Sequence, residues 1–509
     1  MAPASNKSSA GGMPFIVSTG TKKPDPESRK LIRSHVMLGK NRGRTLRPRP
    51  NKIIELSGTE DSNEGSSSLG EHVGGSLVEE SLSIIPRKVG SDLSFIQFAD
   101  TIEESTVAVI LQFSSIAKKA LFPLESCINF GVKDMAWMEA LTVDAAYLHA
   151  MVFSAQGYFD MLVGRIASCR PGSTRAADPQ VVKTLGLLRE RLEMSGQHAE
   201  RMIKTSFSTA TVVMCLAHHA HVLGEHQAAR HHMQGLRKIV DLNGGLWGLR
   251  DNTKLLIEIF RLYIGMTLYD GSSPLFFADL IWEPYWPYPD FTPSSSVLVL
   301  FPFIPESYEF LNNLDPEIAQ TWSVTKSFSA LVNHAASTHT KLPKEYLFDT
   351  MTSVICRLLH KSNDFERGSL DETIRLGLLA FCSSVFLQWT GMRFPYAQFP
   401  AVYRDCLVNL QLPELDGNGG GGGGGDIAFS FLSQLLLWLL MVGAVSVFTE
   451  DDDTWLKPWL CVNIDLCEAN GSWATMRDVL NSFMWVEMLH DGPGKVIFDS
   501  TSSSESYSK

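Results

Sequence analysis

Cysteine is scarce in this chain of 509 residues, which has none before Cys127. The eight cysteines form no CxxC pair, and five residues separate the closest two, Cys461 and Cys467, which fits neither a zinc knuckle nor a redox motif. We therefore expect reduced thiols in an intracellular protein, without a disulfide framework. The first twenty residues also lack the charged start and apolar core of a secretory signal, so export is not expected.

Common catalytic signatures are missing as well. The sequence contains no HExxH, GxSxG or GxxxxGKS/T motif, and the polyglycine tract at 416–426 matches GxGxxG only trivially, because no strand precedes it. These absences weigh against an enzyme. We predict a non-enzymatic protein with no catalytic, cofactor-binding or metal-binding residues and no cofactor.

One stretch of twenty-two residues, 427–448 (IAFSFLSQLLLWLLMVGAVSVF), has no charged side chain. Such a run is long enough to span a bilayer. However, serine and glutamine side chains lie within it, both flanks are acidic, and no lysine or arginine anchors it before Lys457. We expect a buried central helix and no association with a membrane.

Strand patterns are sparse, and residues 296–303 (SVLVLFPF) form the best of them. Apolar residues instead recur at three- and four-residue spacing, which is typical of amphipathic helices. Because no alternation of strands and helices appears, we predict an all-α fold, a large multi-helix regulatory domain with a disordered N-terminal arm. We expect helices at 106–122, 144–166 with Asp144 as its cap, 179–194, 205–223, 227–242, 253–269, 315–334, 344–360, 371–391, 399–410, 427–448 and 471–489.

Composition divides the chain into an arm, a body and a tail. Residues 1–85 are rich in Ser, Gly, Pro and charge, so we predict a disordered arm that is basic at 22–52 and acidic and serine-rich at 55–80. The helical body is expected at 86–490, interrupted by a proline-rich loop at 282–296 and the polyglycine linker at 416–426. Residues 491–509 are expected to form a disordered tail.

The basic arm, residues 22–52, contains eleven Lys and Arg residues against only Asp25 and Glu27, within a chain of net charge −11. Such a segment can bind the backbone of a nucleic acid or serve as a nuclear-import signal, and neither role needs a folded domain. The alternative is a solvated tail without a partner. The candidate residues for import or DNA-backbone contact are Lys22, Lys23, Arg29, Lys30, Arg33, Lys40, Arg42, Arg44, Arg47 and Arg49.

Six of the fourteen histidines fall between His218 and His232, in a segment that ends on the glycine pair Gly244–Gly245. On a helix, His218 and His221, or His221 and Glu225, could share a face and reach one metal ion, but such a pair supplies only part of a site. The acidic segment 450–454 could in principle hold a divalent cation, although a solvated turn is the stronger interpretation.

The glycine pair follows an amphipathic helix, whose apolar positions are Ala229, Met233, Leu236 and Val240. A phosphate loop needs the opposite order, because the free amides lie at a helix N-terminus. We therefore predict a left-handed turn at Asn243 and Gly244 after the helix C-terminus. His231 and His232 are expected to be ordinary side chains.

Several segments together resemble proteins that carry the fungal-specific transcription-factor domain. They are PFIVSTGTKKPDPESRKLIRSHVM, PRKVGSDLSFIQFAD, LFPLESCINF, DAAYLHAMVFSAQGYFD, KTLGLLRERL and HHMQGLRKIVDLNGGL, over residues 14–270 and more loosely to about 490. The most specific are RKLIRSHVM at 29–37 and the H-x-x-G-L-x-x-I/V-V-x-x-x-G-G element at 232–245. Many such regulators bind DNA through an N-terminal zinc binuclear cluster of six cysteines, which the cysteine-free segment before Cys127 lacks.

The resemblance implies a nuclear transcription regulator with a helical, partner-binding regulatory domain, often encoded beside the metabolic or biosynthetic genes that it controls. We expect protein partners, such as another transcription factor or a second copy, and DNA contact through the basic arm. A metal-dependent or unrecognised biosynthetic enzyme centred on 218–232 is the alternative.

Overall fold

The computed structural model describes residues 97–116, 121–131, 137–162, 178–193, 207–271, 275–276, 306–387, 396–410, 424–469 and 472–502. The chain divides into two units, Met1–Ser68 and Leu69–Lys509, and every described residue belongs to the second. The basic arm and its acidic continuation lie outside the described residues. So do the expected strand at 296–303, the loop at 282–296 and positions 416–423 of the glycine linker.

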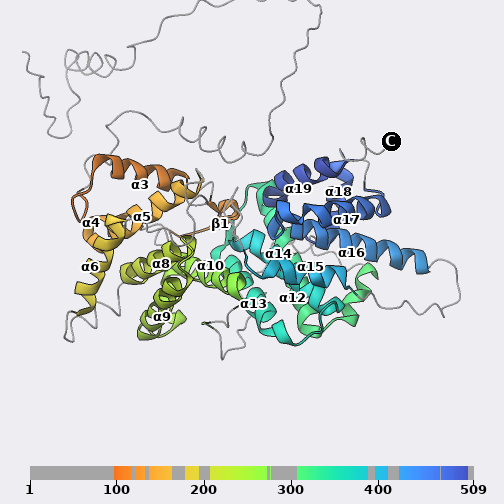
Figure 1. Cartoon of the computed structure of the whole chain (residues 1–509), viewed down its shortest axis with the longest axis horizontal. Coiled ribbons are helices and arrows are strands. Elements are labelled where there is room, and N and C mark those ends of the chain that lie inside the picture. Colours follow the sequence, from red (N-terminus) through yellow and green to blue (C-terminus); the bar gives the residue numbers. More distant parts are fainter. Residues whose placement is uncertain are drawn as a thin grey trace, which may run out of the picture. The chain divides into compact units, whose positions relative to one another are not determined.

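Helices make up almost all of the described part of the chain (Figure 1), so the predicted all-α fold is confirmed. The only β-structure there is a parallel bridge between β1 (Ile128–Asn129) and β2 (Leu342–Pro343), with Ile128 opposite Leu342. The α-helices are α3 (Glu104–Ile116), α4 (Trp137–Val143), α5 (Ala145–Leu162), α6 (Pro179–Glu193), α8 (Phe207–Val222), α9 (His226–Leu242), α10 (Thr253–Asp270), α12 (Pro316–Thr338), α13 (Lys344–His360), α14 (Leu370–Cys382), α15 (Phe399–Val408), α16 (Gly424–Ser446), α17 (Asp453–Leu466), α18 (Trp473–Phe483) and α19 (Glu487–Ser502). Short helical turns lie at η3 (Pro123–Cys127), η5 (Leu246–Asn252), η6 (Glu306–Asn313), η7 (Lys361–Asn363), η8 (Ser383–Leu387) and η9 (Glu450–Asp452).

Helix α5 begins at the predicted cap. The Asp144 carboxylate accepts a hydrogen bond from the Tyr147 backbone N–H at 3.1 Å, and it also pairs with Arg191 of α6 at 2.5 Å. Ser208 of α8 donates to the same carboxylate at 2.5 Å. One N-cap residue therefore also ties three helices together.

Two sequence predictions at the C-terminal end are wrong. The helix expected at 471–489 is divided into α18 and α19, because Met484 is extended (φ −155°, ψ 127°) and Met484, Trp485 and Val486 are buried between them. The disordered tail expected from 491 is helical as far as Ser502. The turn signal Gly492–Pro493–Gly494 is overridden, since Gly494 lets the helix pack directly on Trp473 and Trp485.

Two further boundaries differ. Helix α16 begins at Gly424, so the last three residues of the expected glycine linker belong to this helix. The single helix expected at 371–391 ends at Cys382 and continues as the π-helical turn η8.

Helix α16 is the buried central helix that the sequence predicts. Residues 437–442 are each 0% exposed, and α14, α17, α18 and α19 pack against the helix. Across the described ranges, no helix combines the length and hydropathy that a bilayer span requires.

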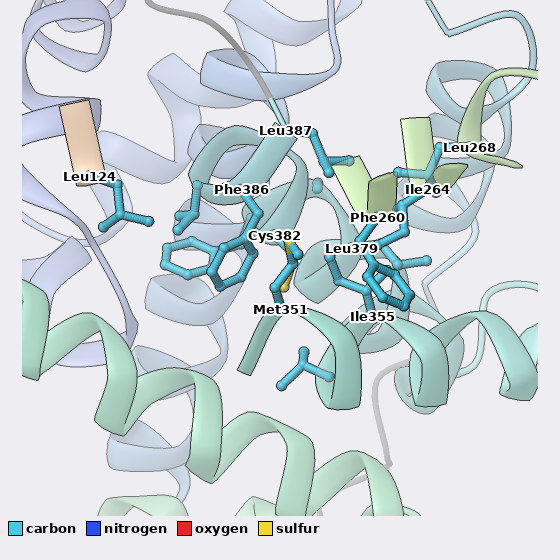
Figure 2. Packing of buried hydrophobic residues seen from close by; sticks show 14 of the residues in the cluster. Leu124, Phe260, Ile264, Leu268, Met351, Ile355, Leu379, Cys382, Phe386 and Leu387 are labelled. Atoms are coloured by element: carbon cyan, nitrogen blue, oxygen red, sulfur yellow. The ribbon is translucent and has the colours of Figure 1, made fainter. Parts of the chain in front are cut away.

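The core continues through the middle of the chain, where α10, α13, α14 and η8 meet (Figure 2). Phe260 and Ile264 of α10 lie beside Ile355 of α13 and Leu379 of α14, and all four are almost completely buried. This packing positions the polar clusters described next.

Candidate functional site

The histidine-rich segment folds into the helical pair α8 and α9, which are joined by a tight turn at Leu223–Glu225. Gly224 takes a left-handed φ of 77°, and the Glu225 N–H donates to the Ala220 carbonyl at 2.8 Å. Glu225 is therefore a turn residue outside α8. The predicted pairing of His221 and Glu225 on one helical face does not occur.

The three histidines of α8 have different neighbours. His219 packs edge-on against Phe153 of α5, with ring centroids 5.1 Å apart. Burial lowers the pKa of His218 to about 4, although the negative charge of Glu258 on α10 opposes this shift. His221 contacts Tyr269 near the C-terminal end of α10. His218 and His221, three residues apart on α8, lie close enough for the charge of one to lower the pKa of the other, so they are neighbours as the sequence predicts.

His221, His226 and Tyr269 form an aromatic cluster at the end of the α8–α9 pair. The His226 and Tyr269 rings stack at 4.2 Å between centroids, and His221 meets them edge-on at 5.4 and 5.6 Å. Burial lowers the pKa of His221 to about 4, helped by His218 and His226 and opposed by Asp270. The Nδ1 atoms of His221 and His226 are both buried and lack a hydrogen-bond partner.

Two imidazole rings can coordinate a metal ion, but a stable site needs further ligands. Within the part of the chain that the structure describes, no group of three or more His, Cys, Asp or Glu side chains is arranged to hold one. The residues at hand therefore form a packed aromatic cluster in which two ring nitrogens have no hydrogen-bond partner.

The α9 C-terminus follows the prediction from its glycine pair. Gly245 N–H donates to the Val240 carbonyl at 2.9 Å, and Gly244 N–H donates to the Asp241 carbonyl at 3.1 Å, which is the Schellman pattern. Gly244 has a left-handed φ of 87°, whereas Asn243, at −85°, does not enter the left-handed region as expected. His231 is exposed and His232 is half-buried.

A second polar cluster, which the sequence did not reveal, is the ion-pair quartet Glu125, Lys254, Glu258 and Arg261. Arg261 Nη1 lies 2.6 Å from Glu125 Oε1 and 2.9 Å from Glu258 Oε1, while Lys254 contacts both carboxylates. Burial raises the pKa of Glu258, but the charges of Lys254 and Arg261 and their hydrogen bonds outweigh it and bring the pKa to about 2. Two positive and two negative charges balance, so the quartet leaves no net charge for an ionic substrate.

The quartet also connects distant parts of the chain. Arg261 Nε donates to the Phe386 carbonyl of η8 at 2.8 Å, and its guanidinium lies 3.4 Å from the centroid of the Phe122 ring. Glu125 belongs to η3. These contacts identify the quartet as a structural clamp that joins η3, α10 and η8.

A third pair, Ser384 and His490, resembles a nucleophile and its base at first sight, with Ser384 Oγ 2.9 Å from His490 Nε2. The backbone N–H of Val486 donates to His490 Nδ1 at 3.1 Å, so the neutral ring carries its proton on Nε2 and donates it to Ser384. The Ser384 hydroxyl in turn donates to the Phe381 carbonyl at 2.7 Å. A serine nucleophile needs the opposite arrangement, in which histidine accepts the hydroxyl proton. The pair is therefore a buried structural link between η8 and α19.

Sequence reasoning missed both clusters because each depends on a contact between residues 106 to 136 apart in the chain. Lys254, Glu258 and Arg261 are at helical spacing, but no sequence signal marks Glu125 as their partner. Comparison of the chain with protein-family models, with curated proteins and with solved structures gives no match that would place it in a family.

Proposed function

We propose that this chain is a non-enzymatic, nuclear transcription regulator of the fungal type, which acts through a helical, partner-binding body and a basic arm. The proposal includes control of metabolic or biosynthetic genes, as the resemblance implies. Protein partners are expected to bind the body. The basic arm contacts the phosphate backbone of DNA and does not read the base edges.

The observation that carries the proposal is the uneven distribution of charge. Eleven cationic and two anionic residues give the basic arm a charge of +9, and because the whole chain carries −11, the remainder carries −20. A short cationic segment on an acidic chain suits recognition by an import receptor or attraction to phosphates. The internal hydrogen bonding of Ser384 and His490 supports the non-enzymatic part of the proposal.

A fluorescent fusion of the full chain tests the nuclear part. We expect nuclear fluorescence, and we expect it to be lost when the ten candidate Lys and Arg residues between 22 and 49 are replaced with Gln. Deletion of residues 55–80, the acidic and serine-rich segment, is the matched control and should leave localisation unchanged. A wild-type fusion that stays in the cytoplasm would refute nuclear action.

Binding to duplex DNA tests the arm separately. Affinity should fall steeply as salt rises and should be lost with the same Gln substitutions. Sequence-specific binding that survives a large excess of competitor DNA would contradict backbone-only contact.

The alternative, a metal-dependent enzyme centred on 218–232, is favoured by one observation, the unpartnered Nδ1 atoms of His221 and His226. Metal analysis of the purified full chain decides it. We expect no stoichiometric metal, and the His221→Gln/His226→Gln variant should have the same metal content as the wild type. One metal ion per chain that is lost in this variant would support the enzyme instead.

A further inference from the structure

Helix α17 is apolar on two sides. Its inner side is formed by Leu456, Leu460 and Ile464, which are buried against the core. On the outer side Val462 and Leu466 are 57% and 48% exposed, and Pro458 is exposed one turn before them. Residues four apart lie above one another on a helix, so these three form one continuous outer stripe (Pro458, Val462 and Leu466).

A helix that is apolar on opposite sides is normally covered on both of them. Here α16 and α19 pack against α17 (Figure 1), while the outer stripe remains open to solvent. Trp455 and Trp459 occupy helical positions next to the stripe, and their partly buried rings pack against the core. Exposed apolar surface of this kind, with polar margins, marks interaction sites.

The margins of the stripe are acidic. Residues 450–468 contain six carboxylates but only one cation, Lys457, which pairs with Asp453 at 2.7 Å. Glu450 and Asp451 are exposed before the N-terminal end of the helix, and Asp465 and Glu468 are exposed at its C-terminal end. The resulting charge of −5 attracts a cationic partner, and it disfavours a second copy, which would bring −5 against −5.

Helix α6 provides the contrast. Val182, Leu185 and Leu192 are also exposed, at 54%, 42% and 49%. Its charges balance, however, since Asp178, Glu190 and Glu193 are matched by Lys183, Arg189 and Arg191. The α6 surface therefore favours neither a cationic nor an anionic partner, and it serves as a matched control for the outer stripe of α17.

We propose that the outer stripe of α17 is a docking surface for a basic amphipathic helix of a partner protein. The apolar face of that helix covers Pro458, Val462 and Leu466, and its Lys and Arg residues lie against the acidic ends of the stripe. This deepens the partner-binding part of the proposed function and rests on that part.

The test measures binding of a fluorescein-labelled amphipathic Leu/Lys peptide, about 18 residues or five helical turns long, to the purified full chain by fluorescence anisotropy. We expect binding that weakens as ionic strength rises, and that falls at least about tenfold in Val462→Ser/Leu466→Ser and in Asp465→Asn/Glu468→Gln. Val182→Ser/Leu185→Ser should bind as the wild type does. A peptide of the same composition, reordered so that its leucines share no helical face, should bind at least about tenfold more weakly.

Three binding results would overturn the proposal. They are unchanged affinity in Val462→Ser/Leu466→Ser, an equal loss in the α6 variant, or equal binding of the reordered peptide. Circular dichroism of each variant confirms that the helices are retained, which the exposure of the substituted side chains leads us to expect. A wild-type dimer that Val462→Ser/Leu466→Ser dissociates in sedimentation velocity would assign the stripe to a second copy and refute a basic partner.

Failure of this proposal and failure of the proposed function are distinguishable. The peptide assay in solution requires neither import nor DNA. A fusion protein that stays in the cytoplasm would refute nuclear action but would not affect the peptide-binding result. Peptide binding that does not depend on Val462 and Leu466 would refute the docking surface but would not affect import through the basic arm.

Discussion

Acidification should destabilise the protein through His490, whose ring is buried in contact with Phe381 and Trp485. Burial lowers its pKa from 6.5 to about 3. Between these two values the unfolded chain binds a proton that the folded chain excludes, so the free energy of unfolding falls as pH falls from 6.5 towards 3 and is unaffected by this group above 6.5. Each pH unit in that window costs about 1.4 kcal/mol. At about pH 5, His490 alone should therefore remove about 2 kcal/mol of stability relative to neutral pH.

The perturbation that isolates this effect is His490→Asn, which removes the titrating ring but keeps an acceptor for the Val486 N–H. We expect the variant to be less stable than the wild type near neutral pH, because the link to Ser384 and ring packing are lost. The difference in free energy of unfolding between the wild type and the variant should then be smaller by about 2 kcal/mol at about pH 5, because only the wild type is destabilised by protonation of this histidine. Urea unfolding followed by far-UV circular dichroism measures both values. Tryptophan fluorescence is unsuitable because Trp485 lies 4.8 Å from the His490 ring.

Ser384→Ala is the matched control, since it removes the acceptor of the Nε2 proton but retains the buried histidine. Its loss of stability between neutral pH and pH 5 should follow that of the wild type. If His490→Asn lost as much stability on acidification as the wild type, the reasoning from burial would be refuted.

Three further predictions concern single residues of the fold. Arg261→Met leaves Glu125 and Glu258 with only Lys254 as a partner, and urea unfolding should show a free energy of unfolding lower by about 3 kcal/mol or more. Arg189→Met removes a solvent-exposed ion pair and should change that free energy little, so equal effects of the two variants would contradict the buried clamp. Gly494→Ala places a Cβ 2.7 Å from the Trp473 ring and should lower the free energy of unfolding by about 1–3 kcal/mol in thermal unfolding. Gly492→Ala has open space around its Cβ and should not destabilise the protein, whereas a Gly494→Ala variant more stable than the wild type would contradict the close packing of α19 on Trp473. Gly244→Ala forces a side chain into a left-handed φ in the turn after α9 and should destabilise the protein by about 1 kcal/mol. Gly235→Ala, inside α9, should stabilise it by up to about 1 kcal/mol, and melting curves that show the reverse order would contradict this reasoning.

The helices that sequence patterns located well are those whose apolar periodicity and end signals agree. Helix α9 is an example, because Ala229, Met233, Leu236 and Val240 are all buried and the glycine pair ends the helix. Helix α16 is another, since its uncharged run is long enough to identify a helix, and its acidic flanks favour burial within the protein over a bilayer span. In both, the information lies within a few turns of chain.

What could not be predicted depends on contacts between distant segments. The glycines and proline of Gly492–Pro493–Gly494 locally favour a turn, but the two tryptophan rings that pack against Gly494 belong to neighbouring segments and stabilise a helix instead. The side chains of the ion-pair quartet are likewise ordinary surface residues by sequence. Their burial follows only from the approach of η3 to α10.

The last helix has a consequence for synthesis of the chain. Met488 contacts Cys127, Asn333 accepts a hydrogen bond from the Glu487 N–H, and His490 reaches Ser384, so α19 completes contacts with three segments made much earlier. At about 5–20 residues per second, the ribosome releases those segments many seconds before their partners exist. Until α19 has been synthesised, the groups of the nascent chain that it contacts in the folded protein therefore remain uncovered. A chain that terminates before α19 exposes these apolar and hydrogen-bonding groups to chaperones and proteases.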